Sequence, residues 1–186
     1  MRAIQFVSSS MQFSTRQRGL VPPPLYGLVE EDVHRSGQPT VPNFAFLEQL
    51  KLRTVCYLSP DASDNVFRDF LRDEKIEFIH LGAEKETTPW APISEETVLE
   101  ALSLILDVEK HPLLVVDHLG MHRTGVVFGC LRKAQGWALT SIVEEYRRYA
   151  GSKARLQNEQ FVELFDVDLV RVPATPPPWF RVRSDT

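Results

Sequence analysis

Apolar and polar positions follow two periods along this chain, one typical of strands and the other of helices. Short runs rich in Val, Ile, Leu and Phe predict strands over residues 25–29, 33–36, 54–59, 76–81 and 113–116. Apolar residues three or four positions apart predict helices over residues 43–52, 64–75, 94–110, 124–134, 140–150 and 158–167. The run from Leu113 to Val116 is apolar at every position, which predicts a strand at the centre of a sheet.

This order of elements predicts an α/β fold, because strands alternate with helices before the chain ends in helices. We expect one domain with a central, mostly parallel sheet of four or five strands and helices on both faces. A chain of 186 residues that is 43% hydrophobic can bury one such core. We place the domain at residues 21–168, after a variable N-terminal extension (1–20) and before a Pro-rich C-terminal tail (169–186).

Charge and composition narrow the partners and the compartment. A net charge of -4 gives no electrostatic footprint for nucleic acid or an anionic membrane, and no apolar run reaches the ~20 residues of a membrane span. Cys56 and Cys130 both lie in apolar runs, which indicates buried thiols in a reducing compartment. We therefore expect a cytoplasmic protein. The alternative is a mitochondrial one, because the first 20 residues hold three Arg, four Ser and no acid.

Candidate chemistry follows the central strand directly. A loop at the carboxyl end of such a strand, where a helix begins, binds anions through converging backbone N–H groups. Arg123 can close over an anion there with a bidentate fork. The predicted phosphate pocket consists of Asp117, His118, Leu119, Gly120, Met121, His122, Arg123 and Thr124.

Five segments of the chain carry a resemblance to a known family. They are HRSGQPT (34–40), FLEQLKLRTV (46–55), HPLLVVD (111–117), GMHRTGVVFGCLRKAQGW (120–137) and IVEEYRRYAGSKARLQNEQFVELF (142–165). With these segments the chain resembles the plant and fungal atypical dual-specificity phosphatases, which include the fungal oxidant-induced cell-cycle-arrest proteins and an inositol pyrophosphatase. The resemblance implies the fold of cysteine-dependent phosphatases, in which a strand, a phosphate-binding loop and a helix follow one another.

The departures from that family gather around the pocket. In active members the loop sequence is similar to His-Cys-Asn-Arg-Gly-Lys-His-Arg-Thr-Gly. The resemblance puts Asp117 at the position of the nucleophilic Cys. Two basic positions of that loop are Leu119 and Met121 here. Upstream of this loop, relatives have a segment similar to Lys-Glu-Pro-Phe, and this chain has Thr87-Thr88-Pro89-Trp90 in its place. The resemblance therefore implies a degenerate member, for which we expect no catalytic residue.

We expect Asp117 to fill the pocket instead of attacking from it. An aspartyl-phosphate mechanism depends on a metal ion, and the usual companion acid two residues along would be Leu119, so we expect neither metal nor cofactor. The carboxylate can instead accept hydrogen bonds from the loop N–H groups and pair with Arg123. Such a pair gains on the order of 4 kcal/mol before desolvation.

Two functions remain open at this point. The first is a pseudophosphatase that acts as a binding or scaffold subunit in phosphate, inositol-pyrophosphate or stress signalling. Its expected partners are related phosphatase-like proteins in a hetero-oligomer, with an inositol phosphate or a phosphoprotein as a further ligand. Tyr146, Arg147, Arg148 and Tyr149 are its candidate docking anchors, although packing between helices explains the tyrosines equally well. The alternative is an active phosphatase on phosphoprotein or inositol pyrophosphate with a non-standard active site.

Overall fold

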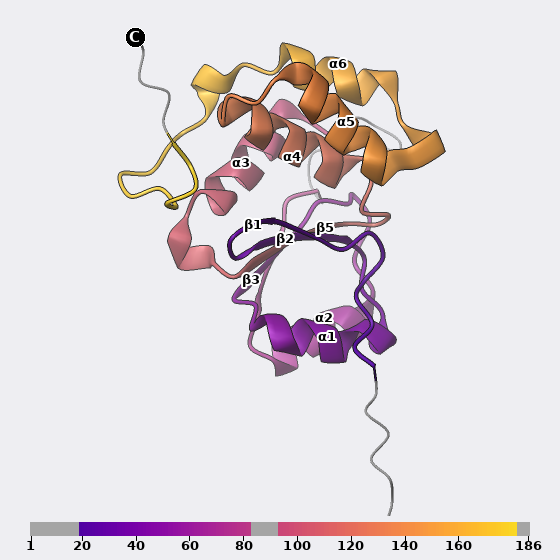
Figure 1. Ribbon diagram of the computed structural model, residues 1–186. Coiled ribbons are helices and arrows are strands. Elements are labelled where there is room, and N and C mark those ends of the chain that lie inside the picture. Colours follow the sequence, from indigo (N-terminus) through magenta and orange to yellow (C-terminus); the bar gives the residue numbers. More distant parts are fainter. Residues whose placement is uncertain (1–18, 83–92, 182–186) are drawn as a thin grey trace, which may run out of the picture.

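The computed structural model describes residues 19–82 and 93–181, and a five-stranded sheet forms its centre (Figure 1). The strands are β1 (Gly27–Glu30), β2 (Val33–Gly37), β3 (Thr54–Tyr57), β4 (Glu77–His80) and β5 (Leu113–Asp117). Their spatial order is β1-β2-β5-β3-β4, with β1 antiparallel to β2 and the other neighbours parallel. All five residues of β5 are buried, which confirms the central strand that the apolar run predicts.

Helices cover both faces of this sheet, as predicted. The helices are α1 (Phe44–Leu50), α2 (Asn65–Asp73), α3 (Glu95–Ile105), α4 (Arg123–Ala134), α5 (Leu139–Ala150) and α6 (Leu156–Leu164). Short 3-10 turns lie at η1 (Val41–Asn43), η2 (Val108–Lys110), η3 (Gly151–Lys153) and η4 (Val167–Leu169). Figure 1 shows α1 and α2 below the sheet and α3 to α6 above it. Apolar side chains form a separate buried cluster on each face.

Side-chain caps explain where two of the helices begin and where a predicted one is broken. Ser94 accepts a hydrogen bond from the Thr97 N–H at the start of α3, and Asp64 accepts one from the Val66 N–H at the start of α2. The helix predicted over residues 94–110 ends at Ile105 and is followed by η2. Asp107 caps η2 by accepting from the Glu109 N–H, which starts a new turn instead of continuing α3.

The sheet register brings three strand ends to one place. Gly37 at the end of β2 lies opposite Asp117, and Tyr57 at the end of β3 lies opposite Val116. The loop that follows β5 therefore starts between two neighbouring strands, at the edge of the sheet where α/β proteins bind ligands.

The C-terminal segment packs onto the domain. Phe180 is only 6% exposed and belongs to the core cluster above the sheet, and the Trp179 ring lies parallel to the His111 ring with centroids 6.4 Å apart. The two aromatic residues that end the PPPWF segment (176–180) therefore pack on the domain.

Truncating Phe180 tests how much this packing stabilises the fold. We expect Phe180→Ala to lower the free energy of unfolding by about 3 kcal/mol, because the change removes buried apolar surface and leaves a cavity. Urea denaturation measures the difference. Leu164→Ala is the matched control, since Leu164 is 82% exposed and its truncation should change stability by less than about 0.5 kcal/mol. A loss below about 1 kcal/mol for Phe180→Ala would show that the segment contributes little.

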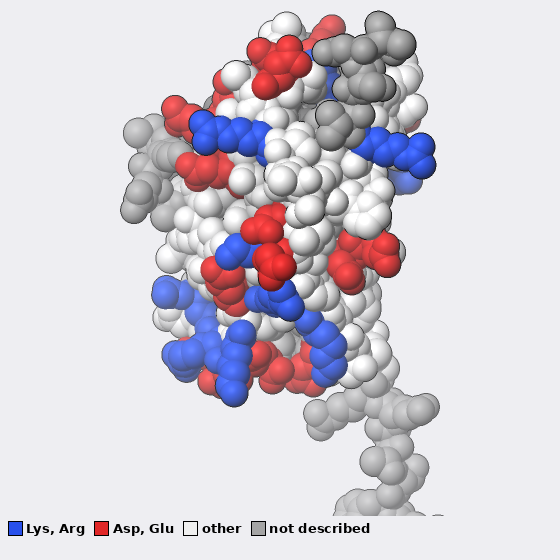
Figure 2. Space-filling model, turned by 90° about the vertical axis from the view of Figure 1, so that its left-hand side faces the viewer, with Lys and Arg blue, Asp and Glu red and all other residues white. Residues whose placement is uncertain are grey.

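Charged side chains of both signs lie next to one another on the lower half of the face in Figure 2. Oppositely charged side chains also form ion pairs, such as Lys110–Glu77 with an N–O distance of 2.9 Å. No helix in the described parts of the chain has the length and apolar character to span a membrane.

Candidate functional site

The loop between β5 and α4 is a backbone cradle for negative charge. It runs from Asp117 to the first residues of α4, whose N-terminus carries a partial positive charge from its unpaired N–H groups. Gly120 adopts a φ of +74°, in the left-handed region that favours glycine. This turn directs the Gly120 N–H back toward the end of β5, where it meets Asp117.

The Asp117 side chain occupies the cradle. One carboxylate oxygen, Oδ1, accepts a hydrogen bond from the Gly120 N–H. The other, Oδ2, accepts from the N–H groups of Arg123 at 2.8 Å and Thr124 at 3.1 Å, and from the Thr124 hydroxyl at 3.4 Å. Asp117 is 3% exposed, so these donors replace water around its charge. The expected hydrogen bonds from the loop N–H groups to the carboxylate are therefore present.

The expected pairing with the Arg123 guanidinium is wrong. Arg123 meets Asp117 through its backbone N–H, while its Nη1 donates to the Leu58 carbonyl at 3.2 Å. No ion pair between these two side chains lies within 4.0 Å in the described structure. The start of α4 supplies backbone donors close to the carboxylate, and these donors hold it without the guanidinium.

A buried arginine supports the loop from below, and no pattern in the sequence predicts it. Arg35 on β2 has no exposed surface, and its Nη2 donates to the Gly120 carbonyl at 3.1 Å and to the Thr124 hydroxyl at 3.2 Å. Its guanidinium carbon lies 3.6 Å from the centroid of the Tyr149 ring. Burial lowers the pKa of Arg35 to about 10, against the opposing influence of Tyr149 and Asp117. Arg35 therefore stays charged at neutral pH and adds positive charge beneath the cradle.

The remaining pocket residues range from exposed to fully buried. His118 and Leu119 are exposed at the tip, and Thr124 is buried beneath the loop. Met121 and His122 are half-buried, and His122 Nδ1 lies 3.3 Å from the Tyr146 hydroxyl. Burial and then the nearby Arg155 lower the pKa of His122, so this ring is neutral at neutral pH. Thr87-Thr88-Pro89-Trp90 lie outside the described residues.

The candidate docking anchors on α5 are mostly engaged within the domain. Tyr146 is 4% exposed and its hydroxyl accepts from the Arg155 N–H and the Asn158 amide. Tyr149 is half-buried against Arg35. Arg147 forms two hydrogen bonds of 2.7 Å with Glu159. Packing within the domain accounts for Tyr146, whereas Tyr149 is only partly covered.

The two cysteines of the chain lie in the core and not at the loop. Cys56 on β3 and Cys130 on α4 are fully buried free thiols. Burial raises the pKa of Cys56 to about 12 and also raises that of Cys130. Neither thiol is available as a thiolate nucleophile at neutral pH.

Comparisons with known proteins agree with this geometry. The model of the tyrosine phosphatase family matches residues 20–181. Probable tyrosine-protein phosphatase DG1060 of Dictyostelium discoideum is 55% identical over 150 residues, which are 81% of this chain and 90% of that protein. Inositol diphosphatase DSP4 of Arabidopsis thaliana is 40% identical over 158 residues, covering 83% of this chain and 80% of its own.

A solved structure extends the likeness to three dimensions. The core catalytic domain of the PP-IP phosphatase SIW14 from S. cerevisiae, in complex with citrate, superimposes with a TM-score of 0.75 at 35% identity. The match covers 80% of this chain and 90% of that domain. The family model matches most of the chain, which also has a strand, a loop and a helix in succession at the site. This chain therefore belongs to the tyrosine phosphatase family.

Proposed function

We propose that this protein is a pseudophosphatase, which uses the phosphatase fold as a binding or scaffold subunit in phosphate, inositol-pyrophosphate or stress signalling. The observation that carries the proposal is the Asp117 carboxylate, which takes hydrogen bonds from three backbone N–H groups and one hydroxyl of the loop. These are the donors that an anion in the cradle would need. The resemblance to active family members places their nucleophilic Cys at this position.

Electrostatics supports the same proposal. A phosphate dianion about 4 Å from the Asp117 carboxylate would meet a repulsion on the order of 8 kcal/mol at an effective dielectric near 20. An active thiolate is also an anion, so charge alone does not separate the two cases. The difference is that the carboxylate already accepts from the donors on both sides of the loop.

Other nucleophilic routes find little support in the described residues. Cys56 and Cys130 are buried thiols with raised pKa values. An aspartyl-phosphate mechanism uses a metal held by further acids, and the residue two positions after Asp117 is Leu119. Within residues 19–82 and 93–181 no three His, Cys, Asp or Glu side chains gather closely enough to hold a metal ion.

The proposed partners are related phosphatase-like proteins, with an inositol phosphate or a phosphoprotein as a further ligand. Of the anchors proposed on α5, Arg147 and Arg148 are exposed, and Arg147 is paired with Glu159. A scaffold that lacks turnover needs only a stable surface, and the buried clusters on both faces of the sheet provide a rigid support for one.

A second candidate function is phosphatase activity on phosphoprotein or inositol pyrophosphate with a non-standard active site. The names of the relatives favour this candidate, because several proteins that are 40–43% identical to this chain are named inositol diphosphatases. Arg123, at the start of α4, would then stabilise the transferred phosphoryl group.

Activity measurements on the purified chain decide between the two candidates. We expect no turnover of an aryl phosphate or an inositol pyrophosphate, with or without magnesium, above that of Arg123→Ala. The catalytic core of SIW14 serves as the positive control for the assay. Turnover that falls on the order of a hundredfold in Arg123→Ala would refute the pseudophosphatase and support the active enzyme. Circular dichroism of the variant confirms that it is folded.

A further inference from the structure

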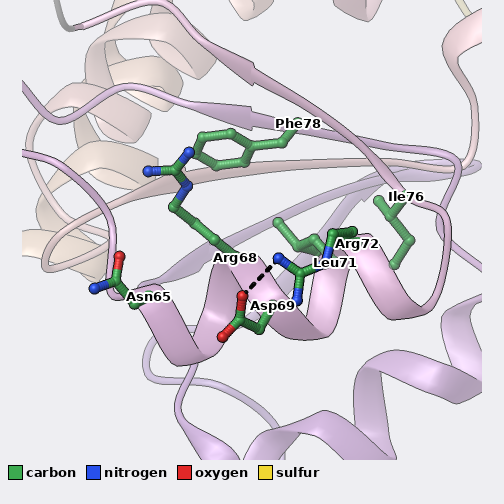
Figure 3. Close-up of a pocket in the computed structure, with 7 residues that line it drawn as sticks. All are labelled: Asn65, Arg68, Asp69, Leu71, Arg72, Ile76 and Phe78. Carbon is green, nitrogen blue, oxygen red and sulfur yellow. Dashed lines mark ion pairs between the residues drawn. The ribbon is translucent and has the colours of Figure 1, made fainter.

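A groove of about 710 Å³ lies on the opposite side of the sheet from α4, between α2 and the edge strand β4 (Figure 3). It is lined by Asn65, Arg68, Asp69, Leu71, Arg72, Ile76 and Phe78. Figure 3 shows the Arg68 side chain reaching from α2 toward the Phe78 ring on β4. The groove thus has a helix on one side, a strand edge on the other and an aromatic ring between them.

Arg68 is the cation in the lining of this groove that forms no ion pair with another described residue. Arg72 pairs with Asp69 at 2.9 Å and lies 3.8 Å from Asp73, so its charge is compensated. The Arg68 guanidinium carbon lies 6.0 Å from the Phe78 ring centroid, and no carboxylate within the described residues pairs with it. A cation held against a ring keeps its hydrogen-bond donors available to a ligand.

The outer edge of β4 offers unpaired backbone groups beside this cation. Glu77 and Leu81 donate their N–H groups to the carbonyls of Arg53 and Tyr57, at 2.9 Å each. Because backbone groups alternate in direction along a strand, those of Phe78 and His80 point away from β3. In residues 19–82 and 93–181 no other segment bonds to these outward groups, and β4 ends the sheet.

We propose that this groove binds an extended, acidic segment of a partner protein, which adds to the sheet as a strand beside β4. The outward groups of Phe78 and His80 would form the main-chain hydrogen bonds, which give affinity in this binding mode. A side chain that points toward α2 would enter the groove against Phe78, and a carboxylate there would pair with Arg68. This surface is separate from the loop after β5, so the inference does not depend on the proposed function.

A second copy of the chain fits this edge less well than an acidic partner. Pairing two copies through β4 would bring a second Arg68 to the same edge, where the two cations repel each other. An acidic segment instead supplies the carboxylate that Arg68 lacks. An exposed sheet edge without such a partner would also invite unspecific pairing, which a charged neighbour such as Arg68 restrains.

Selection of octapeptides from a random phage-displayed library on the immobilised full chain tests the proposal. We expect the enriched sequences to carry Asp or Glu among β-forming residues. Synthetic versions should bind the wild type and Arg171→Glu equally in fluorescence anisotropy, and bind Arg68→Glu at least tenfold more weakly. Arg171 is the matched control because it is exposed and its substitution changes the charge by the same amount. It lies between Val170 and Val172, which pack against the core cluster on the other side of the sheet.

Hydrogen exchange of the Phe78 and His80 amides adds a readout of position, because a strand added to β4 should slow both. The proposal is overturned if no acidic sequence is enriched, if Arg68→Glu binds the peptides unchanged, or if neither amide gains protection. Protection of these amides that rises with protein concentration in the absence of peptide would identify a second copy as the occupant and would overturn it as well.

Discussion

Asp117→Asn is expected to raise the affinity of the loop for sulfate at least tenfold over that of the wild type. The change removes the negative charge that now accepts from the Gly120, Arg123 and Thr124 N–H groups. The repulsion that it relieves is on the order of 4 kcal/mol for each unit of ligand charge at 4 Å and an effective dielectric near 20. A tenfold gain in affinity corresponds to about 1.4 kcal/mol of binding free energy. The gain therefore remains measurable even if solvent screening removes most of the relieved repulsion.

Size and charge can be separated at the same position. Asn has nearly the shape of Asp and still fills part of the cradle, whereas Asp117→Ala vacates it. We therefore expect sulfate affinity to increase from the wild type through Asp117→Asn to Asp117→Ala. Isothermal titration calorimetry measures all three proteins, with Asp168→Asn as a control that changes the net charge equally on the exposed turn η4.

Equal sulfate affinity in the wild type and Asp117→Asn would mean that the carboxylate does not obstruct the cradle. A gain that appears equally in Asp168→Asn would reflect net charge and not the loop. Urea denaturation of each variant accompanies the titrations, because removing a buried carboxylate leaves its backbone donors without a partner and affects stability as well.

The architecture could be predicted from the sequence because burial imposes a local pattern. Strands buried on both faces are apolar at successive positions, as in β5, and helices with one buried face repeat every three or four residues. The predicted strands and helices therefore agree with the observed ones to within a few residues, apart from the break between Ile105 and η2. The position of the loop followed from the same pattern, since it lies where the central strand ends.

Interactions across the fold could not be predicted in this way. Arg35 contacts Gly120 and Thr124, which lie 85 and 89 positions further along the chain. Nothing in the local sequence of β2 distinguishes a buried arginine from an exposed one. The contact of Asp117 with Arg123 was expected between side chains, but the choice between a guanidinium and a backbone donor depends on how the helix start is oriented.

Gly120→Ala is expected to lower the free energy of unfolding by about 3 kcal/mol or more and to remove the cradle geometry. Two costs combine at this position. A residue with a Cβ pays roughly 1–2 kcal/mol in the left-handed region, where Gly120 has a φ of +74°. The added Cβ would also lie 2.3 Å from the Gly37 nitrogen and 2.8 Å from the Ser36 carbonyl carbon. Both are backbone atoms of β2, so the loop itself has to shift.

Gly151→Ala separates the two costs, because Gly151 has a φ of +55° and no atom within 4 Å of an added Cβ. This control carries a conformational cost without the collision. Because its ψ is -136°, a combination that residues with a Cβ rarely adopt, we expect a loss of roughly 1–3 kcal/mol, and a larger loss for Gly120→Ala. Urea denaturation of both variants gives the difference, which we attribute to the close approach of the loop to β2. The loop shift in Gly120→Ala also separates the Gly120 N–H from Asp117, and amide exchange at Gly120 should become faster. Equal losses for the two variants would show that the loop yields easily, and a rigid cradle held against β2 would then be the wrong description of this site.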